Sequence, residues 1–166
     1  MPRKKSTPDN AVQPTLLYEQ CRTVSFIAIE PPIGNTPLHF QLDATIQTDI
    51  EAGLVIVLIV MEASSERRME TDGEDSEQAA LIRFAITTEN RFRITHLREV
   101  ITQSEGAIIL PTWMMMTMIT TSVGTSRGVL LSKLAGTPYD GGQLPIFGLR
   151  NFMDDPRATS IPIHGI

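Results

Sequence analysis

Residues 38–61 read LHFQLDATIQTDIEAGLVIVLIVM, and this stretch decides the fold class. From Leu38 to Gln47 apolar and polar side chains alternate strictly, which is typical of a strand with one face in a core. A turn at 49–53 follows, and the next eight residues, 54–61, are all apolar. A strand without a polar face is covered on both sides. If a helix covers one side of the sheet, we expect a second subunit on the other.

Two further segments of the first half have the composition of strands. Residues 23–29 (TVSFIAI) are β-branched and apolar, and residues 79–88 with 91–95 predict a returning strand that bends at Glu89–Asn90. The sequence therefore predicts about four antiparallel strands. Between them, residues 62–77 hold nine charged side chains, which indicates a solvated hairpin loop. The alternative is an acidic docking patch composed of Glu70, Asp72, Glu74, Asp75 and Glu77.

The second half of the chain predicts one long helix at Thr112–Leu134. Pro111 stands at its start, where the missing N–H would be unpaired in any case, and Gly136-Thr137-Pro138 ends it. Three consecutive methionines point in directions about 100° apart, so that turn needs cover on most of its circumference. Small residues form a stripe at helical spacing, although two glycines in it also favour a kink. We expect an oligomer interface that includes Trp113, Met114, Thr117, Met118, Thr121, Gly124 and Gly128.

The length and composition indicate one cytoplasmic domain that binds no nucleic acid. The chain has 166 residues, 42% of them apolar, and a net charge of −5, so no basic face is expected. Residues 1–14 are polar and proline-broken, which predicts a disordered lead-in rather than a signal peptide. Residues 15–155 form the domain and 156–166 a tail. The uncharged stretch 106–126 contains Pro111 and many hydroxyl residues, which favours a helix buried between protein surfaces over a membrane span.

The sequence predicts neither an active site nor a metal or cofactor site. Cys21 has no histidine near it in sequence and is expected to be a buried structural thiol. The three histidines are far apart, and a single cysteine makes a Cys/His zinc site implausible. Val129 follows Gly128, where a phosphate-binding loop requires lysine. The chain is therefore expected not to be an enzyme.

The order of these segments resembles the SecB family of export chaperones. Val24-Ser25-Phe26 followed by Pro31-Pro32 is similar to the family's first strand and crossover loop. Residues 38–48, 54–63 and 79–95 resemble its second, third and fourth strands. Ile108-Ile109-Leu110-Pro111 resembles the start of its long helix, and Leu144-Pro145-Ile146-Phe147 the segment before its second helix. The similarity spans residues 18–153.

The resemblance implies an α+β fold with a four-stranded antiparallel sheet, a long helix and a short C-terminal helix near 149–153. It implies a homotetramer, a dimer of dimers, that acts as an ATP-independent holdase for unfolded polypeptide clients. The peptide-binding groove carried over by position is lined on one side by Phe26, Ile29, Ile33, Leu38 and Phe40. Ile146, Phe147, Leu149 and Phe152 line the other side.

The chain departs from the family pattern in three places. Residues 127–142 extend or rebuild the short stretch that follows the family's long helix. The zinc-binding tail that helps some members contact a secretion motor is absent, and only 5% of residues are aromatic. Three alternatives therefore stay open: a general secretion chaperone, a chaperone for one dedicated client, and a SecB-fold interaction or assembly protein without chaperone activity.

Overall fold

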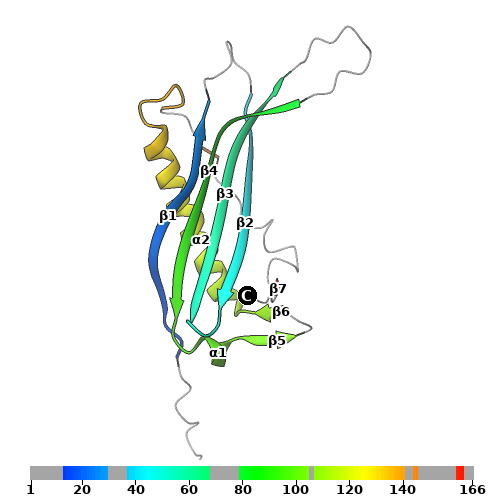
Figure 1. Ribbon diagram of the computed structural model, residues 1–166, viewed down its shortest axis with the longest axis vertical. Helices are drawn as coiled ribbons and strands as arrows, with labels where there is room; N and C mark the ends of the chain where they lie inside the picture. The colour runs from blue at the N-terminus through cyan, green and yellow to red at the C-terminus, as the bar shows by residue number, and fades with distance from the viewer. Residues whose placement is uncertain are drawn as a thin grey trace, which may run out of the picture.

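The protein has an α+β architecture in which a long helix packs on one face of an antiparallel sheet (Figure 1). The computed structural model describes residues 13–29, 37–67, 79–104, 107–140, 144–145 and 160–162. The main sheet has the strand order β1-β4-β3-β2, and a small sheet, β5-β6-β7, lies at one end of it. The predicted class, four antiparallel strands with a helix, is confirmed. The elements are β1 Leu16–Ala28, β2 His39–Asp49, β3 Leu54–Arg67, β4 Ala79–Ile94, α1 Leu97–Val100, β5 Thr102–Ser104, β6 Ala107–Ile109, α2 Thr112–Leu134 and β7 Ser160–Pro162.

The predicted hairpin between β2 and β3 is present, and its turn depends on a glycine. Asp49 faces Leu54 across the ladder, and its carboxylate accepts a hydrogen bond of 3.0 Å from the Ala52 N–H. Gly53 has φ +63°, and a Cβ atom there would lie 2.9 Å from the Ile94 carbonyl oxygen. The same Ile94 donates its N–H to the Gly53 carbonyl at 2.8 Å. Close approach of β4 therefore excludes a side chain at position 53.

The strand β1 is longer than the sequence predicts, and β4 lacks the bend that the sequence predicts at Glu89–Asn90. β1 begins at Leu16 instead of residue 23, because register shifts at Tyr18/Gln20 and at Thr23/Ser25 interrupt the alternation that would reveal it. The bend expected at Glu89–Asn90 is wrong: β4 pairs continuously through both residues with β1 and β3. Their polar side chains are accommodated on the two faces of a continuous strand rather than in a turn.

The helix α2 has the predicted bounds and continues through both glycines without a break. It ends at Leu134, and Gly136, two residues later, has φ +75°, the left-handed conformation common just after a helix. Met114 and Met118 are fully buried against the sheet, which removes them from the expected oligomer interface. The core between α2 and the inner face of the sheet includes Val55, Val57, Ile59, Met61, Ile86, Phe92, Ile94, Met114, Met118 and Leu130.

A chain of polar side chains crosses this core. The Tyr18 hydroxyl donates to the Asn90 side-chain oxygen at 3.1 Å, and the Asn90 amide donates to the Thr88 hydroxyl at 3.2 Å. The Thr88 and Ser126 hydroxyls are 2.5 Å apart, and Ser126 donates to the Ser122 carbonyl at 2.6 Å. These directional contacts fix how α2 lies along the sheet, because a displaced helix would leave buried hydroxyls unpaired.

The small sheet joins the end of the chain to the start of α2. β7 pairs antiparallel with β6, so residues 160–162 of the expected tail belong to a sheet. β6 directly precedes Pro111, and β7 also contacts β2. No helix in the described part of the chain is long and apolar enough to cross a membrane.

Candidate functional site

Aromatic side chains from two strands and the turn after α2 meet at one end of the sheet. Figure 1 shows this end, where β1 finishes and β2 begins. The Phe84 ring of β4 lies 6.1 Å from Phe40 of β2 and 5.1 Å from Tyr139, centroid to centroid. The Tyr139 ring meets Phe84 edge-on at 66°, an arrangement that favours aromatic pairs. We call Phe40, Phe84 and Tyr139, together with the nearby Phe26 of β1, the aromatic end.

The turn after α2 positions Tyr139. The Thr137 N–H donates to the Leu134 carbonyl at 3.0 Å, and its hydroxyl donates to the same carbonyl at 2.6 Å. Asp140 accepts a hydrogen bond from the Gly136 N–H at 2.9 Å. The Tyr139 hydroxyl donates to the Ile29 carbonyl at 2.7 Å, and burial raises its pKa, so the hydroxyl stays protonated as a donor. This contact ties the end of β1 to the end of α2.

Cationic side chains accompany the aromatic rings at this end. The Lys133 ammonium lies 5.6 Å from the centre of the Phe26 ring, within the range of a cation–π contact. Arg83 is buried beside the cluster and donates from Nε to the Ser65 hydroxyl at 2.6 Å. The aromatic end therefore combines apolar rings with the Lys133 ammonium and the Arg83 guanidinium beside them.

Three isoleucines next to the aromatic end are exposed. Ile27, Ile29 and Ile82 have exposed fractions of 52%, 43% and 38%. Ile27 pairs with Ala85, and the Ile29 N–H donates to the Arg83 carbonyl at 2.8 Å, so their backbones are held by β4. Ile27 is level with Glu62 and Ile82 with Ser64, so both isoleucines lie on the face of the sheet opposite the Phe84 ring. Rigid, exposed apolar side chains of this kind form a surface that can hold apolar polypeptide segments.

The structure brings part of the predicted groove together. Phe26, Leu38 and Phe40 pack partly buried against the core, and Ile29 is exposed beside them. The segment that leads to the other predicted wall is anchored, because Arg127 donates to the Leu144 and Pro145 carbonyls at 2.9 and 3.3 Å. Outside the described residues lie Ile33, Ile146, Phe147, Leu149 and Phe152 of the groove and Glu70, Asp72, Glu74, Asp75 and Glu77 of the acidic patch.

The outward side of α2 carries the rest of the predicted oligomer interface. Trp113 and Leu131 are exposed by 53% and 43%, and Thr117, Gly124 and Gly128 are exposed between them. A Cβ atom built on either glycine would contact nothing within 4 Å. Thr121 is half-buried beside this row. The outward side is uncharged over its first four turns, which is unusual for a helix facing water.

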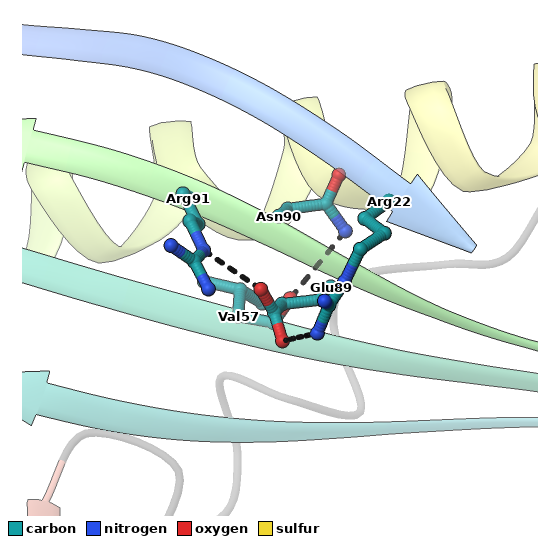
Figure 2. Close-up of polar contacts among 5 residues, drawn as sticks. All are labelled: Arg22, Val57, Glu89, Asn90 and Arg91. Carbon is teal, nitrogen blue, oxygen red and sulfur yellow. Dashed lines mark hydrogen bonds and ion pairs between the residues drawn. The ribbon is translucent and has the colours of Figure 1, made fainter. Parts of the chain in front are cut away.

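The face of the sheet opposite α2, which we call the outer face, carries ion pairs to a nearly buried carboxylate (Figure 2). Glu89 accepts hydrogen bonds from Arg22 at 3.0 Å and from Arg91 at 2.7 Å, and its side chain is only 12% exposed. The hydrogen bond from Arg91 is the main reason that the pKa of Glu89 lies below its usual value. Asn90 points to the opposite side of the same strand and reaches the Val57 carbonyl at 3.4 Å.

The groups considered for chemistry lie in structural positions. Burial raises the pKa of the half-buried Cys21 thiol, which keeps it protonated and weakly nucleophilic at neutral pH. Among the described residues, no three His, Cys, Asp or Glu side chains are placed to hold a metal ion. His39 lies on the exposed side of β2, as expected from the alternation.

Two residues of the aromatic end escaped the sequence analysis. Phe84 shares an inner face with Ile86, and that periodicity could have identified it as a neighbour of Phe40 across the sheet. Tyr139 gave no such signal, because its position depends on how the turn after α2 folds back toward β1. Comparison of the chain with protein-family models, curated proteins and solved structures found no match.

Proposed function

We propose that this protein is an ATP-independent holdase that binds apolar segments of non-native polypeptides at the aromatic end. The observation that carries the proposal is the exposure of Ile27, Ile29 and Ile82 next to the cluster of Phe40, Phe84 and Tyr139. A client segment would lay its apolar side chains on the exposed isoleucines at this end of the sheet. Affinity would come from desolvation of apolar surface rather than from a defined set of hydrogen bonds.

The layout of the described elements supports this proposal. A four-stranded antiparallel sheet is followed by a long helix that starts after Pro111, in the order that the resemblance to SecB implies. The end of β1 and the start of β2 flank the aromatic end. Phe26, Leu38 and Phe40 of one predicted wall of the groove pack at this end.

The uncharged outward side of α2 supports the proposed homo-oligomer. Trp113, Leu131 and the open glycines 124 and 128 would pack against a second copy, which could approach closely because these glycines lack side chains. Such an assembly would place several aromatic ends on one particle. Several sites acting together increase the apparent affinity for a long unfolded chain.

The experiment that tests the proposal measures aggregation of a chemically unfolded client after dilution into buffer without nucleotide. The full chain is expected to suppress light scattering at about equimolar ratio. Ile29→Asp and Ile82→Asp are expected to weaken this suppression several-fold, because a charge at either site repels apolar segments. Suppression that is unchanged in both variants would place client binding elsewhere.

Leu17→Asp is a matched control. Leu17 lies on the same strand, β1, with a similar exposed fraction of 50%, but at the opposite end from Ile29. It is expected to leave suppression unchanged. Circular dichroism and the thermal midpoint of each variant separate loss of binding from loss of folding.

The second candidate function is a SecB-fold assembly protein for one dedicated partner. Lys133, whose ammonium lies over the Phe26 ring, favours it, because a charged group beside an apolar surface selects among partners. Two results together would support this function over the holdase: a pull-down that recovers a single stoichiometric partner, and failure of the protein to suppress aggregation of generic clients.

A further inference from the structure

The outer face of the sheet carries an apolar row between two sides of opposite charge. Leu54, Ile56, Leu58 and Val60 follow one another along β3 on this face, and all four are half-exposed. The alternate residues of the same strand, from Val55 to Met61, are buried under α2. The described elements place nothing over the outer face, and Figure 1 views the sheet from this side with α2 behind it.

The two sides of the row differ in charge. On the β2 side the outer face presents Asp43 and Asp49, and β2 has no Lys or Arg; Glu62 lies on β3 itself, in line with the apolar row. On the β4 side it presents Arg91 and Arg93, with Arg22 beyond them on β1. Glu89 and Glu19 offset part of that charge, because Glu89 binds Arg22 and Arg91 and Glu19 binds Arg93. The β4 side keeps a net positive charge.

We propose that the outer face binds the outer face of a second copy of this chain, with a two-fold axis running along β3. Two sheets can stack symmetrically with the axis along the strands or across them. An axis across the strands would place β2 on β2 and β4 on β4, so that acidic residues face acidic residues. An axis along β3 places β4 of one copy over β2 of the other and joins the apolar rows.

The register agrees with this axis. Across the sheet, Asp49, Leu54 and Arg93 share one level, and Gln47, Ile56 and Arg91 share the next. Rotation about an axis along β3 preserves these levels, so Arg93 of one copy faces Asp49 of the other. Arg91 then faces Gln47, and the paired Glu89 faces the neutral Thr45. Between β2 and β4 no like charges meet, whereas Glu62, which lies on β3 next to the axis, faces Glu62 of the other copy at the end of the apolar row.

The area is sufficient for a specific but modest interface. Three strands about 11 residues long cover about 500 Å² per copy at the usual strand rise and spacing, or about 1,000 Å² in total. That area is close to the lower limit for specific association. We therefore expect a dimer that dissociates on dilution in the micromolar range. This inference does not depend on the chaperone proposal, because the proposed dimer contact is centred on β3 and the proposed client contact lies at the end of β1 and the start of β4.

The test measures the mass of the full chain by sedimentation over a wide concentration range. A charge introduced at the exposed Gln47 tests the direction of the two-fold axis directly, because this side chain is predicted to face Arg91 of the other copy. Gln47→Glu is expected to tighten self-association about threefold, and Gln47→Lys to weaken it by a similar factor. Both changes should shrink at about 0.5 M salt. If Gln47→Glu weakened self-association and Gln47→Lys tightened it, β2 of one copy would lie on β2 of the other, and the proposed axis would be overturned.

Leu58→Asp tests the apolar row itself. It is expected to abolish this association, leaving the particle at half its mass, with the folded spectrum retained. A wild-type chain that stays monomeric at all concentrations would overturn the proposal. An oligomer whose mass and dissociation constant are unchanged in Leu58→Asp, Gln47→Glu and Gln47→Lys would also overturn the proposal. It would show that the outer face does not bind a second copy of this chain.

Discussion

The two faces of β3 have nearly the same composition and different surroundings. Ile59 and its alternate neighbours are buried under α2, whereas Leu58 and its alternate neighbours are half-exposed on the outer face. The inner face is sealed by an intramolecular helix and crossed by the hydrogen bonds of Asn90, Thr88 and Ser126. The difference shows that apolar composition alone does not indicate whether a strand face is buried by the same chain or by another. On the inner face it is this chain, and on the outer face we infer another copy.

The largest expected effect is the loss of a methyl-rich side chain from the inner face. Ile59→Ala would lower the free energy of unfolding by about 3 kcal/mol, because it leaves a cavity between the sheet and α2 that neither can close. Urea unfolding followed by circular dichroism measures this change through its midpoint. A loss below about 1 kcal/mol would show that the inner face is less tightly packed than described.

Removal of the central amide from the polar chain comes next. Asn90→Ala leaves the Tyr18 hydroxyl and the Val57 carbonyl without their partner in the core, and should cost about 2 kcal/mol. Tyr18→Phe is the matched variant, because it removes one of the same hydrogen bonds and is expected to cost less, about 1 kcal/mol. Equal costs for the two variants would contradict the central position of Asn90.

A matched truncation on the outer face should have a smaller effect on folding. Leu58→Ala is expected to cost about 1 kcal/mol in dilute protein, because the side chain is already half in water. Its cost should grow with protein concentration, since the dimer stabilises the folded state. Urea midpoints at two concentrations measure this growth. A midpoint that is independent of concentration would leave the outer face without a self-contact.

The smallest expected effect is the pH dependence of the Glu89 ion pair. The folded-state pKa of Glu89 is lowered, chiefly by the hydrogen bond from Arg91, from the usual value of 4.5. The pair therefore contributes stability above that value, which is lost as pH falls through the lowered pKa. Because Arg22 is 61% exposed, the contribution is about 0.5–1 kcal/mol. Glu89→Gln should flatten the acid side of the stability profile, as measured by urea unfolding at a series of pH values.

The sequence predicts regular elements well and irregular ones poorly. The alternation over 38–48 and the apolar run from Leu54 specify β2 and β3, and Pro111 with Gly136 sets the ends of α2. β1 was underestimated because its two register shifts break the period of two on which strand prediction relies. The straight course of β4 through Glu89 and Asn90 depends on partners that are distant in sequence, Arg22 and Tyr18.

The candidate site was predicted only in part for a similar reason. Phe26 and Phe40 were found because they lie on predicted strands, and both pack at the aromatic end. Tyr139 was missed because a turn, not a periodic element, delivers its hydroxyl to the Ile29 carbonyl. Met114 and Met118 were assigned to an interface because three consecutive methionines do not reveal which one faces the sheet.

The two register shifts in β1 have a consequence for solubility. β1 is an edge strand that carries exposed Leu17, Val24 and Ile27, a composition that ordinarily invites growth of cross-β fibres. At each shift the row of outward-facing backbone donors and acceptors loses its even spacing, so an extended chain cannot pair along the full edge. The irregular strand thus lets the molecule keep apolar side chains in water without acting as a seed for its own aggregation.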